Sequence, residues 1–329
     1  MIETPAKYRP HVGPATHSPE WYAMRKFDPS RTNRPVVFGA SEAAAACGRS
    51  KYSSALELYL MKRGEIDGPE SNEAMSMGNR LEPVILDMYE EKIGRKVVRK
   101  LPMMFSADFA FMAATPDGVL CNLQPVGGYE FERSIDAKAT TGRRLDDSGE
   151  DTDSFGAEGT DQVPIEYLFQ AQQQCAVMGV DSVDFPVLFD GRQLRVYTVN
   201  RDEDLIAEIA SAEKELAERI INGDPPEPDF QHSGTLHLLK KIQGCEVGKV
   251  ITWDGSLAEK WQQLADVKEQ IKHLTKAKDV LDAELFHAMG DAEQAICGPL
   301  TVKRVNVKAT SFVTEKKAYS YLKACKTAK

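Results

Sequence analysis

Apolar residues recur every three or four positions along several stretches of the chain, which is the pattern of helices with one buried face. This spacing predicts helices over residues 41–48, 53–64, 72–94, 165–179, 201–223, 256–289 and 315–326. Serines precede the first two and glycines follow most of them, as expected for helix caps. Pro83 lies inside the third, where it should kink the helix or mark a restart.

Runs rich in apolar and β-branched residues predict strands between these helices. They cover residues 96–106, 111–120, 129–140 and 300–307, with a hairpin of 182–190 and 192–200 around Gly191. The resulting order is helix, three strands, helix, two strands, helix, which predicts an α/β fold with a mixed sheet. The acidic, glycine-rich stretch 141–164 has almost nothing to bury and is predicted to be a mobile loop.

A proline cluster after Gly223 indicates a domain boundary, with domains expected at 1–230 and 231–329. Beyond it, residues 256–289 carry apolar residues in heptad register, with Lys278 interrupting one seam. The seam residues are Leu264, Ile271 and Leu285, and Val267, Leu274, Leu281 and Ala288. We expect this helix to pack on its own domain, against 205–221 for example. A coiled coil with another chain is the alternative.

Composition narrows the class of protein. The chain has 329 residues, of which 42% are hydrophobic. No apolar run approaches the roughly 18–20 residues that a membrane helix needs, and the polar first twenty residues hold no signal-peptide core. Six scattered cysteines form no C-x-x-C pair. We therefore expect a cytoplasmic protein with reduced thiols and no membrane partner.

Charge is distributed unevenly along the chain. The net charge is −9, yet residues 1–63 hold ten Lys and Arg against five acids, and residues 299–329 hold eight against one. Basic terminal segments on an otherwise acidic chain are typical of a protein that binds an anionic partner through those segments. A solvated acidic protein with a basic tail is an equal alternative.

The strand over 129–140 carries the candidate chemistry. A two-residue period puts Asp136 and Lys138 on one face, roughly 7 Å apart along the strand. Glu130, Glu132 and Ser134 share this face, with Phe131, Ile135 and Ala137 opposite. A carboxylate there can hold a hard divalent cation, and a lysine can steer or deprotonate a water and stabilise charge on a phosphate. Taken singly, such a pair is more often a solvated face.

Asp117 lies in a Pro-Asp-Gly sequence at the end of the preceding strand, where it could share the same cation. Such a tripeptide is often only a turn. Together, however, Pro116-Asp117 and Asp136-Ala137-Lys138 resemble the PD-(D/E)xK nuclease signature. The surroundings resemble its YqaJ-like branch, the phage recombination exonucleases related to lambda exonuclease. The similar stretches are 20–25, 38–64, 77–89, 113–120, 135–140 and 167–179.

This resemblance covers about residues 20–230 and implies a restriction-endonuclease-like core. It matches Glu82, Asp117 and Asp136 to metal-binding acids and Lys138 to the catalytic lysine. It also matches the carbonyl of Ala137 to a metal ligand, and Gln170 to the glutamine that follows the core sheet. Mg²⁺ is the expected metal, with Mn²⁺ as an alternative. The acid of the DxK motif is Asp136 where the family more often has Glu.

The N-terminal stretch resembles the part of the family that grips a DNA 5′ phosphate. An arginine after a tryptophan and a serine at a helix start match Arg25, after Trp21, and Ser41. A serine-capped helix start is also an anion site on physical grounds. A surface salt bridge for Arg25 and a plain cap for Ser41 are the alternatives.

Four glutamines occupy the helix over 165–179. At 100° per residue, Gln170 and Gln174 share a face with Tyr167. We favour Gln170 as the functional one because of the resemblance, and expect the others to be surface residues.

The sequence thus predicts a Mg²⁺-dependent exonuclease that degrades one strand of duplex DNA from its 5′ end and leaves 3′ single-stranded tails for recombination. The resemblance implies a ring-shaped trimer and a single-strand annealing protein as partner. The alternatives are an endonuclease or nickase of the same fold and a non-catalytic scaffold that binds DNA ends.

Overall fold

The computed structural model describes residues 11–16, 18–30, 35–68, 72–123, 129–140, 155–244 and 246–305. The chain divides into two compact units, Met1–Ile242 and Gln243–Lys329. The first unit extends twelve residues past the boundary expected at residue 230. Those residues include helix α7 (Thr235–Ile242), whose Leu238 is buried in the core of that unit.

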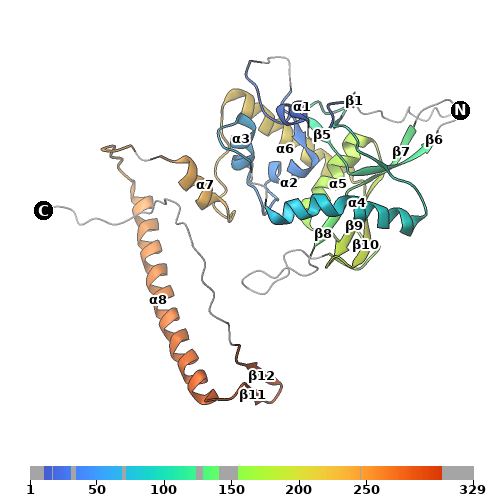
Figure 1. The fold of residues 1–329 in the computed structure, drawn as a ribbon. Coiled ribbons are helices and arrows are strands. Elements are labelled where there is room, and N and C mark those ends of the chain that lie inside the picture. The colour runs from blue at the N-terminus through green and yellow to red at the C-terminus, as the bar shows by residue number, and fades with distance from the viewer. Residues whose placement is uncertain are drawn as a thin grey trace. The chain divides into compact units, whose positions relative to one another are not determined.

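A mixed six-stranded sheet forms the centre of the first unit (Figure 1). Its strands are β3 (Val98–Arg99), β6 (Gly118–Leu123), β7 (Tyr129–Ile135), β8 (Lys138–Thr140), β9 (Ser182–Phe189) and β10 (Gln193–Asn200). The order is β10-β9-β7-β6-β3, and β8 continues the line of β7 along β9. β9 runs parallel to β7 and β8, and the other pairs are antiparallel. The predicted α/β fold with a mixed sheet is confirmed.

A smaller four-stranded sheet lies beside it, in the order β1-β4-β5-β2. Its strands are β1 (His11–Val12), β4 (Met104–Phe105), β5 (Met112–Ala114) and β2 (Phe38–Gly39). The predictions of one strand over 96–106 and one over 111–120 are therefore wrong. The first range divides into β3 and β4, and the second divides into β5 and β6. Each break contains a proline, Pro102 or Pro116, which has no N–H to donate to a ladder.

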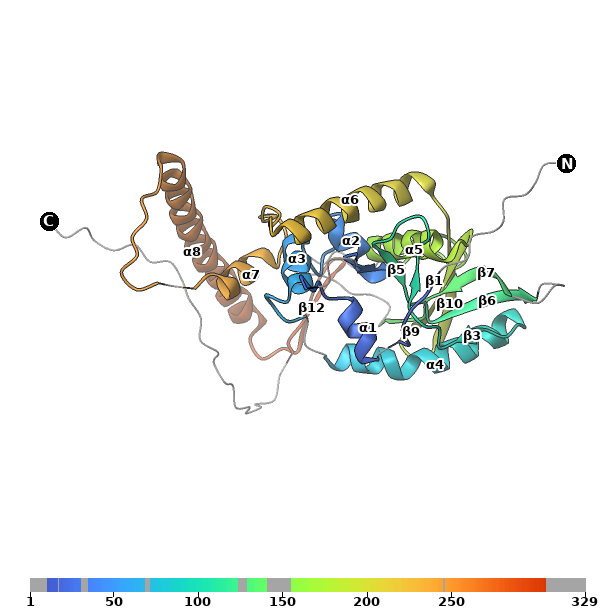
Figure 2. The ribbon, with the colours of Figure 1, turned by 90° about the horizontal axis from the view of Figure 1, so that it is seen from above.

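Helices cover both faces of the central sheet. Helix α4 (Glu73–Ile93) lies on one face, and α5 (Ile165–Met178) and α6 (Glu203–Asn222) lie on the other (Figure 2). Each of the three ends at a left-handed glycine, Gly94, Gly179 or Gly223, as the sequence predicts. Helix α4 continues through Pro83 without a restart.

Shorter helices pack the N-terminal segment against this body. They are α1 (Pro19–Met24), the single turn η1 (Ala40–Glu42), α2 (Ala43–Ala46) and α3 (Ala55–Arg63). Ser54 caps α3 by accepting a hydrogen bond from the N–H of Glu57, and Gly64 ends it. Val36, Phe38 and the buried face of α3 pack with Leu216 and Ile220 of α6, which fixes the N-terminal segment to the sheet-covering helices.

The expectation of a mobile loop over 141–164 is wrong for its last part; residues 141–154 lie outside the described residues. Phe155 packs against Tyr167, Phe189 and Tyr197, with ring centroids 5.0–6.0 Å apart. The N–H of Gly159 also donates to the carbonyl of Val196. One aromatic residue is enough to attach the end of this polar stretch to the core.

The second unit contains α8 (Gly255–Met289) and a hairpin of β11 (Gln294–Cys297) and β12 (Leu300–Lys303). Helix α8 is confirmed, but it has no buried residue, and Leu274 in the heptad seam is 70% exposed. What covers the seam is therefore still a prediction. The basic helix predicted over 315–326 lies outside the described residues. No helix in the described ranges is long and apolar enough to cross a membrane.

Glu213 of α6 is a fully buried acid in the core of the first unit, and neither carboxylate oxygen has a hydrogen-bond partner. Its neighbours are Gln173, whose side-chain oxygen is also unpartnered, and the charged groups of Glu42 and Lys62. Burial, and then the charge of Glu42, raise the pKa of Glu213 well above its ordinary value of 4.5, against the opposing effect of Lys62.

Because the folded pKa of Glu213 exceeds its unfolded value, its contribution to stability is complete below pH 4.5 and is lost as the pH rises towards the folded pKa. We predict that Glu213→Gln, which stays neutral, loses less thermal stability between pH 6 and pH 9 than the wild type does. The measurement is the melting temperature across that range. Glu218→Gln, on an exposed position of α6, is the control and should follow the wild type. Parallel pH profiles for Glu213→Gln and wild type would contradict a buried neutral acid.

Candidate active site

Two strand breaks meet at the centre of the first unit. Thr115–Asp117 separate β5 from β6, and Asp136–Ala137 separate β7 from β8. The N–H of Ala137 donates to Asp117 Oδ2 at 2.8 Å, and the N–H of Asp136 donates to the carbonyl of Asp184 at 3.0 Å. The predicted continuous strand over 129–140 is thus interrupted at the motif itself. The interruption joins the two aspartate segments directly.

The predicted alternation along 129–140 holds only for its second half. Ser134 and Asp136 both turn towards α5, where each contacts Gln174. Phe131 and Ile135, expected on one face, pack in different core clusters. The cause is a register shift in the pairing of β6 with β7, which puts one extra residue on β7 and reverses the faces before it. Glu132 accordingly lies away from the site and pairs with Arg95.

The carboxylate of Asp136 accepts hydrogen bonds at both oxygens. Lys138 Nζ donates to Oδ1. The amides of Gln170 and Gln174 each donate to Oδ2 at 2.6 Å. Asp136 is only 3% exposed, so these three donors take the place of water around a buried charge. The predicted convergence of Asp136, Lys138 and Gln170 is present in the structure.

Lys138 is held in one position by several groups. Its ammonium lies 4.8 Å from the ring centroid of Tyr167 and 5.9 Å from that of Phe185, and 3.4 Å from Gln170 Oε1. Burial lowers its pKa, but the charges of Asp136, Tyr167 and Asp117 outweigh burial and leave the pKa raised. Lys138 is therefore a cation in this arrangement, suited to neutralising charge on a phosphate rather than to taking a proton from water.

Asp117 is an acid under electrostatic strain. Burial first, and then the charges of Asp136 and Glu82, raise its pKa well above the ordinary value, while Lys138 and the N–H of Ala137 oppose the rise. Glu82, on α4, is thus within electrostatic reach of the pair, as the resemblance implies. Carboxylates that repel one another in a buried site are the hard oxygen donors that a divalent cation would stabilise.

Within the described part of the chain, no group of three or more His, Cys, Asp and Glu side chains is arranged to hold a metal ion. Two carboxylates nevertheless satisfy Mg²⁺, which keeps several waters and takes further oxygens from its substrate. The donor chemistry of Asp117 and Asp136 therefore fits this ion.

The expectation that three of the four glutamines on α5 are surface residues is wrong. Gln172, Gln173 and Gln174 are at most 1% exposed. Gln172 bonds the carbonyl of Asn200 and the N–H of Asp202, and Gln173 bonds the carbonyls of Phe38 and Ala113. Gln174 is a site residue that the sequence analysis does not single out. The one sequence feature that indicates it is the helical face that it shares with Gln170 and Tyr167.

Arg25, the predicted phosphate ligand, directly follows α1. Its guanidinium lies 4.7 Å from the ring centroid of Trp21 and 2.9 Å from Glu42 Oε1. Glu42 Oε2 also accepts from the buried Lys62 at 2.7 Å. Burial raises the pKa of Glu42, but Arg25 and Lys62 lower it further, to about 2. Arg25 and Lys62 thus share one acid.

Ser41 lies close to this cluster, but not as predicted. It is inside the turn η1, whose cap is Gly39, and the Gly39 N–H donates to Glu42 Oε2 at 2.7 Å. The prediction that Ser41 caps a helix is therefore wrong, because the helical turn begins at Ala40, before Ser41, and its N-cap is Gly39. The physical argument for an anion site at a serine-capped helix start is lost with it, while the role implied by the resemblance stays a prediction.

Several contacts join the two candidate regions. Strand β2, just before Glu42, pairs with β5, just before Thr115. The ring N–H of Trp21 donates to Thr115 Oγ1 at 3.2 Å, so the segment that carries Arg25 is anchored to the turn that carries Asp117.

Residues 20–181 match the family model of the YqaJ-like viral recombinase domain. That match spans the Arg25 segment, both aspartates, Lys138 and the glutamines of α5. Residues 20–181 of this chain are therefore similar to a YqaJ-like domain. The uncharacterized protein YqaJ of Bacillus subtilis (strain 168) is 27% identical over 281 residues, which are 82% of each chain.

Solved structures similar to this chain include two exonucleases. The alkaline exonuclease LHK-Exo from Laribacter hongkongensis is 21% identical, with a TM-score of 0.42, over 63% of this chain and 94% of that one. A phage-related exonuclease from Haemophilus somnus 129PT is 15% identical, with a TM-score of 0.40, over 59% and 99%.

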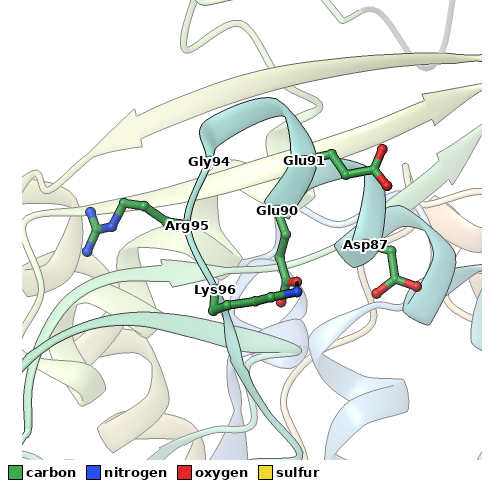
Figure 3. A pocket seen from close by; sticks show the side chains of 6 residues that line it. All are labelled: Asp87, Glu90, Glu91, Gly94, Arg95 and Lys96. Carbon is green, nitrogen blue, oxygen red and sulfur yellow. Dashed lines mark hydrogen bonds and ion pairs between the residues drawn. The ribbon is translucent and has the colours of Figure 1, made fainter.

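A separate cavity of about 310 Å³ lies at the C-terminal end of α4 (Figure 3). Its lining residues are Asp87, Glu90, Glu91, Gly94, Arg95 and Lys96, none of which belongs to the candidate site. Glu90 binds Lys96 at 2.6 Å and Arg99 at 2.9 Å. Asp87 and Arg95 also pair with charged residues of the protein, so we assign this cavity no role.

The strain on Asp117 leads to a stability prediction. Asp117→Asn keeps an oxygen for the N–H of Ala137 and removes a buried charge that Asp136 and Glu82 repel. Without divalent metal at pH 8, this variant should melt at a higher temperature than the wild type. Added Mg²⁺ should raise the melting temperature of the wild type and not that of the variant. The exposed Asp108→Asn is the control and should respond like the wild type. A lower metal-free melting temperature for Asp117→Asn would show that the charge is not under strain.

Proposed function

We propose that this chain is a nuclease of the phage recombination type, and that it is a Mg²⁺-dependent 5′-to-3′ exonuclease acting on double-stranded DNA ends. Its product would be a duplex with 3′ single-stranded tails. The family assignment supports the nuclease, and the arrangement of charged groups in the site supports the chemistry.

The observation that carries this proposal is the convergence of Asp117, Asp136 and Lys138 from two separate strand breaks. Asp117 is tied to the Asp136 segment through the N–H of Ala137, and Lys138 is bound to Asp136. A buried structural ion pair would be complete without Asp117, whose burial beside other acids costs stability. A second acid retained at such a cost is expected where function requires it.

Asp117 and Asp136 would hold the metal, with Glu82 and the carbonyl of Ala137 completing the set by resemblance. The bound ion would polarise the scissile phosphate and lower the pKa of a water. Lys138, which is protonated in this site, would stabilise the additional negative charge on the phosphate as the water adds. Gln170 would orient both charged groups, since its amide contacts Asp136 and its carbonyl oxygen faces Lys138.

The cluster of Arg25, Glu42 and Lys62 would receive the 5′ phosphate. A terminal phosphate carries close to two negative charges and would compete with Glu42 for the guanidinium of Arg25. Lys62 would keep Glu42 compensated while Arg25 turns to the ligand. Ser41, exposed on the turn beside this cluster, would add a hydroxyl donor. The excess of basic residues in 1–63 supports the same contact with a DNA end.

A ring-shaped trimer around DNA and a single-strand annealing protein as partner complete the proposal. Both rest on the family resemblance. A ring would explain how a protein of negative net charge stays bound to DNA. A ring that encloses the duplex does not depend on electrostatic attraction over the whole protein surface.

We predict that Lys138→Ala and Asp117→Ala each reduce DNA cleavage about 10²–10³-fold or more, since each removes a charged group needed at the reacting phosphate. The measurement is the rate of digestion of an end-labelled linear duplex in Mg²⁺, with circular dichroism to check folding. Lys96→Ala, in which a 91% exposed side chain is removed, is the matched control and should cleave normally. Wild-type turnover by either folded variant would reject this active site.

We also predict that the wild type digests 5′-phosphorylated ends faster than 5′-hydroxyl ends, and that Arg25→Ala loses most of this preference. A hydroxyl end leaves the arginine pocket without its ligand. The measurement compares rates on two duplexes that differ only in the terminal phosphate. Lys26→Ala, which removes the neighbouring exposed cation, should keep the preference. If wild type shows no preference, or Arg25→Ala keeps it, Arg25 is only the salt-bridge partner of Glu42.

A further inference from the structure

One carboxylate oxygen in the candidate site is held more tightly than the function assigned so far explains. Asp136 Oδ2 accepts two amide N–H groups, from Gln170 and Gln174, each at 2.6 Å. Gln170 is partly exposed and also faces Lys138. Gln174 is 1% exposed and reaches only the acid and the strand that carries it.

The other end of the Gln174 amide is fixed as well. Ser134 Oγ lies 2.7 Å from Gln174 Oε1 and is itself fully buried. Ser134 and Asp136 are two residues apart on the same face, so the glutamine spans them and closes a ring of hydrogen bonds. Each member of this ring is buried, and water does not replace a bond that is lost.

The chemistry of the three groups sets the direction of every bond. An ionised carboxylate only accepts, so the amide nitrogen of Gln174 must face Asp136. Its carbonyl oxygen therefore faces Ser134, whose hydroxyl must donate. The carboxylate thus sets the orientation of the amide, and Ser134 holds that orientation by donating to the amide oxygen. Without Ser134, the amide would be held at one end only and its buried oxygen would lose its donor.

The geometry points to Gln174, oriented by Ser134, as a positioning residue that fixes the Asp136 carboxylate for divalent metal. This inference rests on the proposed function and extends it. With Oδ2 held by two amides, rotation of the carboxylate is restricted, and Oδ1 stays on the side of Lys138. Partners that orient a metal-binding carboxylate are typically worth about 10–100-fold in metal affinity or activity.

The same helix offers a matched control for a purely structural role. Gln172 is equally buried, at 1% exposure, and also makes two hydrogen bonds, to Asn200 and Asp202. Neither bond touches the candidate site. Gln172→Met and Gln174→Met therefore remove the same amide from the same helix, and both leave polar groups unsatisfied in the interior.

The test is Mg²⁺ binding by calorimetry on the full chain without DNA, together with the melting temperature of each protein in the absence of metal. Gln174→Met should bind Mg²⁺ about 10–100-fold more weakly than the wild type. Gln172→Met should keep the wild-type affinity for Mg²⁺, even if it lowers the melting temperature as much as Gln174→Met does. Ser134→Ala, a smaller change, should also weaken Mg²⁺ binding. If Gln174→Met does not fold, Ser134→Ala is the variant that tests the inference.

Wild-type Mg²⁺ affinity in Gln174→Met, or in Ser134→Ala when the first variant is unfolded, would show that the ring of hydrogen bonds has only a structural role. An equal loss of affinity in Gln172→Met and Gln174→Met would do the same. A wild type that neither binds Mg²⁺ nor cleaves DNA would instead contradict the proposed function, so the two failures are distinguishable.

Discussion

The structure of the site depends on one buried carboxylate, that of Asp136, and on the donors that keep it charged. Isolated burial of such a group would be strongly unfavourable, and here Lys138 and two glutamines supply its hydrogen bonds. These donors come from β8 and α5, so stabilising one charge fixes how a helix lies against the end of a strand. The packing of α5 and the chemistry of the site are consequences of the same requirement.

The surroundings of Asp117 disfavour its negative charge, whereas those of Asp136 stabilise it. Its carboxylate lies close enough to Asp136 for their charges to repel, and the metal-free protein bears that cost. The backbone bond from Ala137 holds the two segments together despite the repulsion. The arrangement is stable overall yet has a local excess of negative charge, which is the condition under which a divalent cation binds strongly. The N-terminal cluster shows the reverse, with Arg25 and Lys62 both paired to Glu42.

Features fixed by neighbouring residues could be predicted from the sequence. Helices α3, α4, α5 and α6 end at Gly64, Gly94, Gly179 and Gly223 because only glycine takes the left-handed conformation there at low cost. The Asp136–Lys138 pairing followed from two-residue spacing. Features that depend on distant partners could not be predicted. The shift in register between β6 and β7 depends on how two strands meet, and the start of η1 depends on the bond from the Gly39 N–H to Glu42. The burial of Gln172 and Gln173 on α5 depends on carbonyls more than twenty residues away.

We propose that these opposed charges form a metal-dependent centre that digests DNA from 5′ ends. The most direct measurement follows the wild type on linear duplexes labelled at the 5′ or the 3′ end and on a closed circular duplex, with Mg²⁺ and with chelator. The account predicts rapid release of the 5′ label, retention of the 3′ label on a shortening duplex, an intact circle, and no reaction in chelator. Cutting of the circle, release from the 3′ end first, or the absence of any Mg²⁺-dependent cleavage would contradict it.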